Sequence, residues 1–240
     1  MSRIEDLARL YLILDRLAAS SGGRRSLSRL RSHRDWPQRG VYFFFEPGEM
    51  RSGSGHGPRL VRIGTHGLKD GARSTLYQRL RQHAGTLSGS GGNHRGSIFR
   101  LLVGRALIER GDCRQCPSWG VKGDIGAAAT VLGRNKAELK ADEKPIELSV
   151  SDYLGRLPFL WLSIEDAAGP NSLRGVIERN VIALASGVRE PSIDPPSPLW
   201  LGRSSHRDAV RNSGLWNQQH VDEEYDPRFL GQLDAAVQST

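Results

Sequence analysis

Two short apolar segments joined by a flexible loop constrain the fold of this chain most strongly. Residues 40–48, GVYFFFEPG, are rich in aromatic and β-branched residues and end in a Pro-Gly pair. Residues 59–64, RLVRIG, form a second run of the same kind, and the residues between the two runs are polar and glycine-rich. Such runs predict two β-strands joined as a hairpin.

One charged residue, Arg62, lies in the middle of the second predicted strand. Side chains alternate between the two faces of a strand, so Leu60 and Arg62 are expected on one face and Val61 and Ile63 on the other. If the strands pair with their apolar sides buried, Tyr42 and Arg62 can face the same way. Arg62 then points either into water or toward a site that requires positive charge, and the pattern alone leaves both open.

The rest of the chain alternates helical patterns with one further strand. Residues 111–150 are expected to be irregular or locally helical, with a mixed-charge stretch, NKAELKADEK, that solvates a helix face. The order predicts an α+β domain with a small three-stranded antiparallel sheet flanked by helices. The predicted elements are a helix over 4–19, the two strands, helices over 75–85 (capped by Ser74) and 97–111, a strand over 158–166, and helices over 172–187 and 227–237.

Composition is that of an ordinary soluble globular protein, with 38% hydrophobic and 25% charged residues among 240. No apolar run approaches the roughly 18–20 residues of a membrane helix. The N-terminal segment lacks the apolar core of a secretory signal. We therefore expect no membrane association and a cytoplasmic location.

The formal net charge is +8, which makes a polyanion such as nucleic acid a plausible partner without establishing one. The two cysteines, Cys113 and Cys116, form one C-x-x-C. Because no second pair or suitable histidine set follows, a structural zinc site is disfavoured. Two reduced loop thiols are the favoured interpretation, and whether they bind a metal stays open.

The order of several motifs resembles that of the GIY-YIG nuclease family. GVY at 40–42 and RIG at 62–64 are followed by a helix on which Arg79 and His83 lie one turn apart. In that family two tripeptide strands precede a helix with an arginine, a later helix carries a metal-binding glutamate, and an asparagine follows. Glu178 in VIERN and Asn217 in GLWNQ match the last two positions. The resemblance spans roughly residues 40–220 and is closest to the restriction-endonuclease branch.

Two features depart from the family pattern. Arg62 stands where the family has its second tyrosine, and the spacer between Glu178 and Asn217 is longer than usual. A tyrosine hydroxyl is ordinarily protonated at neutral pH, so a nearby cation is needed for it to act as a base. The resemblance and the expected shared face therefore predict that Arg62 assists Tyr42 and attracts phosphate.

The resemblance implies a metal-dependent DNA endonuclease of restriction or defence type that hydrolyses phosphodiester bonds. Tyr42 would help to take a proton from the attacking water. Arg79 and His83 would hold the scissile phosphate, and His83 could instead relay a proton. Glu178 would bind Mg²⁺ (or Mn²⁺), a hard cation that keeps most of its waters, and Asn217 would orient the phosphate or a metal-bound water.

The predicted nuclease domain covers residues 37–220, with an N-terminal helix and basic arm over 1–36 and a C-terminal helix over 221–240. Insertions near 111–157 and 187–215, with the basic arm, would contact double-stranded DNA. His94 and Arg95 lie where a loop begins a helix and are secondary DNA-binding candidates. A symmetric homodimer would suit cutting both strands of a palindrome.

Two other functions stay open. A non-catalytic DNA-binding protein could keep this fold, with Arg62 marking lost chemistry, and would bind DNA in a salt-sensitive way without cleaving it. A repair or mobile-element nuclease would act on branched or damaged DNA. Taken singly, each candidate residue is more often an ordinary structural residue, and only their order favours the nuclease.

Overall fold

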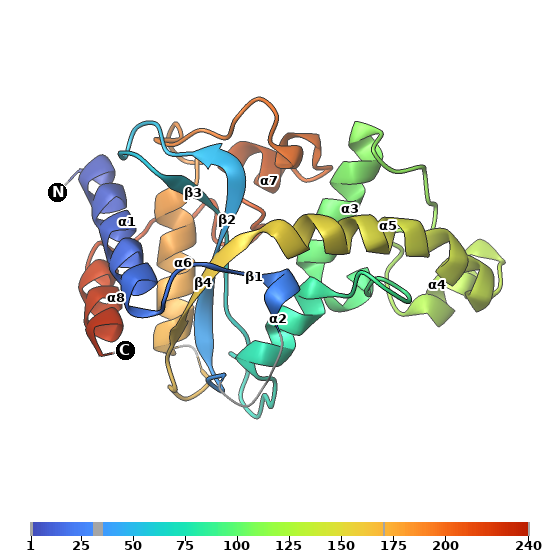
Figure 1. The fold of residues 1–240 in the computed structure, drawn as a ribbon, viewed down its shortest axis with the longest axis horizontal. Helices are drawn as coiled ribbons and strands as arrows, with labels where there is room; N and C mark the ends of the chain where they lie inside the picture. Colours follow the sequence, from blue (N-terminus) through green and yellow to red (C-terminus); the bar gives the residue numbers. More distant parts are fainter. Residues whose placement is uncertain (1, 31–35, 170, 240) are drawn as a thin grey trace.

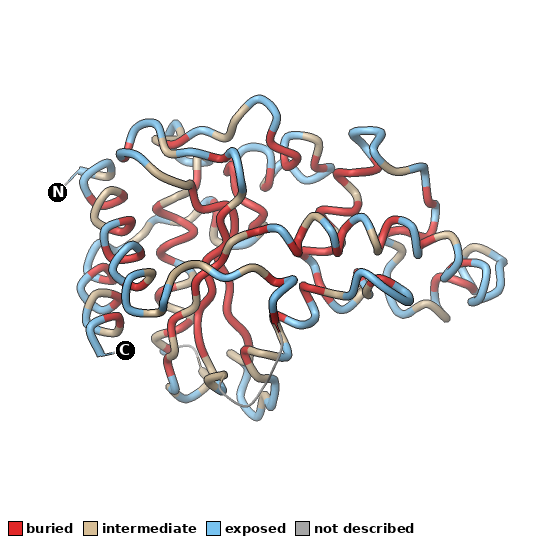
Figure 2. The backbone as a smooth tube through the Cα atoms, in the orientation of Figure 1, coloured by how far each residue is buried: buried red, intermediate tan, exposed pale blue. Residues whose placement is uncertain are grey.

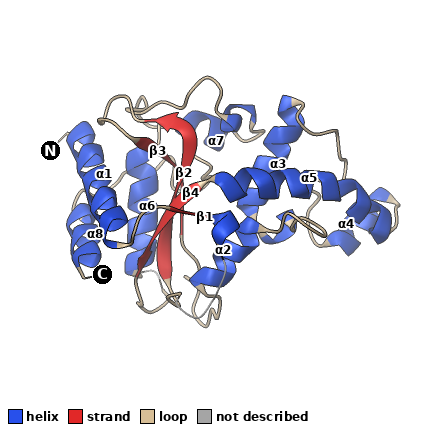
Figure 3. Cartoon of the chain, viewed as in Figure 1, coloured by secondary structure: helices blue, strands red, loops and turns tan. Residues whose placement is uncertain are grey.

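The computed structural model describes residues 2–30, 36–169 and 171–239 as a small antiparallel sheet with helices packed on both faces (Figures 1 and 3). In chain order the elements are α1 (Arg3–Ser20), β1 (Arg25–Ser26), the 3-10 helix η1 (Leu27–Arg29), β2 (Gly40–Met50), β3 (Pro58–Gly64), α2 (Leu76–Ala84), η2 (His94–Gly96), α3 (Ile98–Arg110), α4 (Ile125–Leu132), α5 (Lys136–Arg156), β4 (Pro158–Ser163), α6 (Leu173–Ala185), η3 (Leu201–Ser204), α7 (Asp208–Ser213) and α8 (Phe229–Gln238).

The sheet confirms the predicted α+β class. In the described part of the chain it has four antiparallel strands in the order β1-β4-β2-β3, so β2 and β3 form the expected hairpin. The fourth strand, β1, adds two residues to the edge next to β4. It comes from the basic segment 24–39, which the sequence predicted as an arm; residues 31–35 of that segment lie outside the described residues.

A bulge in β3 changes the predicted alternation. Phe44 pairs with Arg62 and Phe45 with Leu60, which leaves Val61 as an extra residue. The prediction that Val61 and Ile63 share a face is therefore wrong, because the two side chains join the cores on opposite sides of the sheet. The expected shared face of Tyr42 and Arg62 is confirmed, since they belong to neighbouring pairs two residues apart in the ladder.

Each face of the sheet buries its own core (Figure 2). Helices α1, α6 and α8 cover one face, and α2, α3 and α5 cover the other (Figure 1). The first and last helices pack on each other, so both ends of the chain belong to the same layer. The helices of the predicted terminal segments 1–36 and 221–240 thus pack on α6 of the central segment 37–220, while the segment boundaries stay a prediction.

The segment predicted to be irregular or locally helical forms α4 and most of the 21-residue helix α5. The expectation of a solvated mixed-charge face is wrong at Glu143, which is 5% exposed and forms an ion pair with Arg95. The helix also continues through Pro145, because Asn135 caps its start and a buried stripe on its inner face packs on α2 and α3. Figure 1 shows α4 and the start of α5 extending away from the sheet.

The ends of the predicted helices differ from the observed ones by one or two residues. Thr75, rather than Ser74, caps α2, because its hydroxyl accepts from the backbone N–H of Gln78 in a reciprocal capping box. Helix α6 ends at Ala185 instead of Gly187. None of the helices in the described ranges is long and apolar enough to cross a membrane.

Candidate active site

A buried hydrogen-bond chain starts at Tyr42 on β2. The Tyr42 hydroxyl lies 3.0 Å from Nε2 of His83 on α2, and Nδ1 of His83 lies 2.7 Å from Oγ of Ser97. Tyr42 is 1% exposed and His83 is fully buried. A neutral imidazole has one donor and one acceptor nitrogen, and the two hydroxyl groups can satisfy either tautomer.

His83 is neutral in this environment. Burial is the main cause that holds its pKa well below the ordinary value, and the positive charges of Arg79, Arg62 and Arg100 lower it further. Its ring can therefore accept a proton more readily once an anion offsets these charges. The sequence had left His83 either a phosphate contact or a proton relay, and it did not predict this contact with Tyr42.

The Tyr42 side chain occupies space that Gly64 leaves open. Tyr42 pairs with Gly64 across β2 and β3. A Cβ atom at position 64 would lie 2.2 Å from the Tyr42 hydroxyl oxygen, which is closer than non-bonded atoms approach. The glycine that ends the second tripeptide thus sets where the hydroxyl lies.

Two arginines, Arg62 and Arg79, lie near the hydrogen-bond chain of Tyr42, His83 and Ser97. Arg62 is 6% exposed, and its guanidinium donates to the Trp216 carbonyl and lies 4.8 Å from the centroid of the Phe99 ring. Burial lowers the pKa of Arg62, and the negative charges that Tyr42 and Glu178 can carry oppose that shift. The Arg62 side chain is therefore a buried cation placed between the predicted base and the predicted metal ligand.

Arg79 is half-buried on α2, one turn before His83. Its guanidinium donates over long distances, 3.2 Å to the Gln82 side chain and 3.4 Å to the Gly96 carbonyl. Both partners are neutral, so the charge of Arg79 is not neutralised by an ion pair in the described part of the chain. A phosphate group could replace these weak contacts with charge-assisted ones.

Glu178 on α6 holds one carboxylate oxygen in place and leaves the other without a partner among the described residues. Its Oε1 accepts from the backbone N–H of Thr65 at 3.1 Å, just after β3. Burial raises the pKa of Glu178, while Arg62, the Thr65 hydrogen bond and His220 act in the opposite direction. A half-buried carboxylate with a raised pKa gains stability when a cation binds beside it.

Asn217 pairs with the backbone of the edge strand. Its Oδ1 accepts from the Ile63 N–H at 3.1 Å, and its Nδ2 donates to the Ile63 carbonyl at 2.8 Å. The side-chain amide thus completes β3 on its open edge, next to Arg62. This geometry differs from the predicted role of orienting the phosphate.

A cavity of about 400 Å³ joins three of the predicted residues: Arg62, Glu178 and Asn217. Tyr42, Arg79 and His83 do not line this cavity, but Tyr42 and Arg79 both lie close enough to Arg62 to influence its charge. The remaining lining residues are Ile98, Ile182, Gln218, Gln219 and His220. The structure thus brings the six predicted residues together around Arg62.

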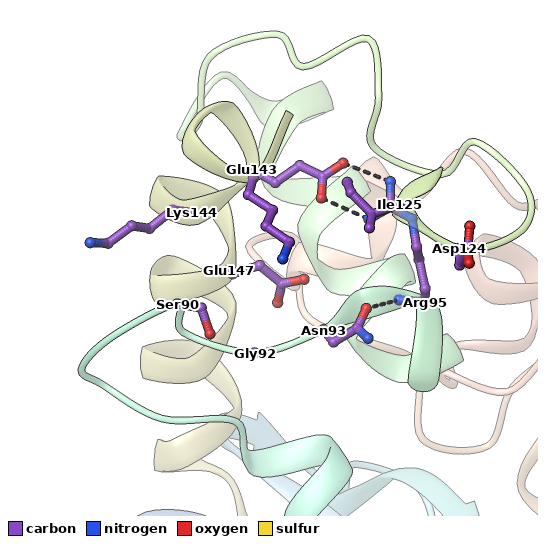
Figure 4. A pocket seen from close by; sticks show the side chains of 10 residues that line it. Ser90, Gly92, Asn93, Arg95, Asp124, Ile125, Glu143, Lys144 and Glu147 are labelled. Carbon is purple, nitrogen blue, oxygen red and sulfur yellow. Dashed lines mark hydrogen bonds and ion pairs between the residues drawn. The ribbon is translucent and has the colours of Figure 1, made fainter. Parts of the chain in front are cut away.

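His94 and Arg95 have other partners (Figure 4 shows Arg95). The His94 ring stacks on Trp119 at 3.9 Å and bonds Glu147 at 2.9 Å, with 2% of the residue exposed. Arg95 makes a two-pronged ion pair of 2.7 Å contacts with Glu143. Because both side chains stabilise the contact between η2 and α5, we leave them out of the candidate DNA-binding surface.

Several residues of the site gave no clear signal in the sequence. Ser97 contacts His83 through its hydroxyl, and Thr65 contacts Glu178 through its backbone N–H. Neither contact could be predicted from the residue type. His220 has a positive φ of 63° and bonds Glu223 at 2.8 Å. His66, directly after Thr65, is 6% exposed, and burial, followed by Arg174, lowers its pKa to about 4. Only the run RIGTHG, which ends a strand, could have drawn attention to His66.

The donor set fits a hydrated divalent cation better than a closed metal site. The described residues contain no cluster of three or more His, Cys, Asp or Glu side chains that could hold an ion. Cys113 and Cys116 are free thiols. Glu178, with its unpaired oxygen at the cavity, is the one predicted ligand, and Mg²⁺ accepts a single carboxylate when water and phosphate supply the other ligands.

One comparison with known proteins gives a match. A family model described as a GIY-YIG domain matches residues 1–240, the whole chain. Neither a curated protein nor a solved structure is significantly similar to it.

Proposed function

Because the chain belongs to the GIY-YIG family, whose domain is a nuclease domain, we propose that it is a metal-dependent endonuclease acting on double-stranded DNA. One observation carries the proposal. The Tyr42 hydroxyl lies 3.0 Å from a neutral, buried His83, beside a cavity lined by the cation Arg62 and the carboxylate Glu178. A general base, a phosphate-binding cation and a metal ligand are the groups that phosphodiester hydrolysis requires.

The proposed proton path runs from the attacking water through Tyr42 to His83. As water attacks the phosphorus atom, the Tyr42 oxygen accepts its proton while the Tyr42 hydroxyl proton passes to Nε2 of His83. Ser97 bonds the opposite ring nitrogen and holds the imidazole in line. A bound phosphate offsets the charges of Arg62 and Arg79 and so raises the proton affinity of His83 in the substrate complex.

The arginines bind the phosphate and stabilise the charge that develops on it. Arg79 has only weak neutral partners in the described ranges, so its fork can turn to the phosphate. Arg62 is fixed by the Trp216 carbonyl and Phe99, which suits a preorganised charge. Asn217 is a positioning residue in this account, because its amide ties β3 in place next to Arg62.

Glu178 would hold Mg²⁺ or Mn²⁺ through its unpaired oxygen. When bound, such an ion polarises the phosphate and stabilises the leaving oxygen. The Thr65 N–H fixes the carboxylate against rotation, and Arg62 compensates part of its charge when no ion is bound.

A restriction or other defence role is our proposal for the biological setting. It rests on the arginine and histidine one turn apart on α2, a feature that resembles the restriction-endonuclease branch. Cleavage of plain duplex at reproducible positions, made by a symmetric dimer, would agree with this role. Faster cleavage of branched than of plain duplex would instead favour a repair or mobile-element nuclease.

The testing experiment incubates supercoiled plasmid with purified protein and Mg²⁺ or Mn²⁺. We expect nicked or linear product that EDTA abolishes and that Glu178→Gln, which keeps the shape of the side chain, lowers by about 10²-fold or more. Gln219→Ala, a change in the same cavity at a residue without an assigned role, serves as the matched control. Salt-sensitive binding without cleavage under any divalent ion would favour the non-catalytic DNA-binding protein.

A further inference from the structure

Helices α4 and α5 form a hairpin at the end of the molecule farthest from α1 and α8 (Figure 1). The connection is short. Gly133 ends α4 in the left-handed conformation with φ 63° and ψ 30°, and Asn135 caps α5 by accepting from the Glu138 N–H at 2.9 Å. Two helices joined by a three- or four-residue turn with glycine are typical of the helix–turn–helix motif.

The hairpin has a small core of its own. Ala128 and Ala129 of α4 and Leu139 of α5 are buried against one another, and Val121, Ile125 and Leu132 pack around them. The small alanines allow α4 to approach α5 closely. The orientation of the first two turns of α5 is therefore fixed by packing rather than by surface contacts.

The outer side of α5 carries a lysine stripe, defined as Lys136, Lys140 and Lys144. The spacing of four residues places the three side chains along one side of the helix. All three residues are exposed, and none has a hydrogen bond or ion pair within the described part of the chain. Between turns, the exposed Ala137 and Ala141 leave room for a partner to come close to the helix.

The acidic residues of α5 form ion pairs with arginines and not with the lysines of the stripe. Arg134 pairs with both Glu138 and Asp142. The buried Glu143 and Glu147 pair with Arg95 and Arg100. The three lysines thus have no ion pair among the described residues, and Asp124 lies close enough to Lys136 for the lysine charge to lower its pKa, after the larger effect of the Ala127 N–H.

A recess lies beside this stripe. A cavity of about 370 Å³ is lined by Lys140 and Lys144 together with Ser90 and Asn93 of the loop before η2 (Figure 4). Glu143 and Glu147 line it too, and each of them is paired with an arginine. The acidic Asp124 at its edge caps α4 through the Ala127 N–H at 2.8 Å. Lysine, serine and asparagine side chains and backbone N–H groups are common donors to the phosphate oxygens of DNA.

We propose that α4 and α5 form a second contact with duplex DNA, with the lysine stripe on the phosphates and the first two turns of α5 facing the duplex. The inference rests on the proposed function for the identity of the substrate and goes beyond it in naming the element that holds the duplex outside the catalytic cavity. Charge complementarity supports this partner, since the stripe is unpaired and the DNA backbone is a dense row of negative charges.

The test measures the binding of a short mixed-sequence duplex by fluorescence anisotropy in EDTA at several salt concentrations. The variant is K136Q/K140Q/K144Q, and the control is R9Q/R16Q/R228Q, which removes the same charge from the opposite end. Each phosphate contact contributes about 0.9 to the slope of log K against log salt. We expect the lysine variant to lower the slope by about 2 to 3 and the control to leave it unchanged.

The outcomes separate this inference from the proposed function. An unchanged slope in a lysine variant with wild-type circular dichroism would overturn the inference, and so would an equal fall in the control. Glu178-dependent cleavage with an unchanged slope would overturn the inference alone. A lowered slope in a protein that never cleaves DNA would support the inference and contradict the proposed nuclease.

Discussion

Replacing Gly64 by alanine is expected to disable the site while the protein stays folded. The added Cβ would lie 2.2 Å from the Tyr42 hydroxyl oxygen, 2.4 Å from Cζ and 2.6 Å from Cε2. Carbon atoms in contact are about 3.5–4.0 Å apart, so the Tyr42 side chain must move by about 1 Å or more. Because its ring is 1% exposed and packs against Phe44 and His83, it has little room to do so.

A movement of this size takes the hydroxyl out of its 3.0 Å contact with His83. Misplacing a reacting group by about 1 Å can cost about 10²-fold in rate. The crowding itself costs about 1–3 kcal/mol of stability, which a domain of ordinary stability tolerates. We therefore expect Gly64→Ala to cleave about 100-fold more slowly than wild type.

The assay is single-turnover plasmid cleavage with saturating Mg²⁺, accompanied by urea unfolding of the same samples. Gly231→Ala is the matched control, because no atom lies within 4 Å of a Cβ at this exposed position in α8. It should cleave at the wild-type rate. A wild-type rate in folded Gly64→Ala would refute the assigned position of the Tyr42 hydroxyl.

Three further predictions concern the ionisable side chains of Arg62, His66 and Glu178. Arg62→Leu should lower the cleavage rate by about 10²-fold, since it removes a preorganised cation, and a wild-type rate would return Arg62 to a purely structural role. The pKa of His66 is about 4 in the folded protein against 6.5 for a free side chain. The contribution of neutral His66 to the stability of the fold is therefore fully present above pH 6.5 and is lost as pH falls toward 4. As pH falls over that range, the free energy of unfolding measured with urea should fall by about 3 kcal/mol more for wild type than for His66→Asn. Equal decreases in the two proteins would contradict the lowered pKa of His66. Because burial raises the pKa of Glu178, protons compete with the metal, so half-saturating Mg²⁺ should rise as pH falls from 7 to 5. A half-saturating Mg²⁺ concentration that stays constant between pH 7 and 5 would count against Glu178 as the metal ligand.

The sequence predicted the elements whose patterns are local. Alternation in β2 and β3 gave the hairpin, and it correctly placed Tyr42 and Arg62 on one face. It failed at Val61, because a bulge inserts one residue without any change in composition. The order of motifs singled out six candidate site residues, because that order can be read along the chain without coordinates, and the structure places all six around Arg62.

Contacts between distant segments were not predictable in this way. The bond from Tyr42 to His83 spans 41 residues, and that from Ile63 to Asn217 spans 154. The sequence offered His83 as a phosphate contact or proton relay and Asn217 as a residue that orients the phosphate or a metal-bound water. It could not show that their polar atoms contact Tyr42 and the edge strand. The regular helix α5 was missed because Pro145 and alternating charges concealed its buried stripe.

The most direct test of the account is the single-turnover cleavage rate of Tyr42→Phe at saturating Mg²⁺. The substitution removes one oxygen, keeps the ring against Phe44 and leaves Nε2 of His83 without its partner. If Tyr42 relays the proton of the attacking water to His83, the rate should fall by about 10²- to 10⁴-fold while the folded structure is kept. A Tyr42→Phe protein that cleaves DNA at the wild-type rate would contradict the proposed mechanism.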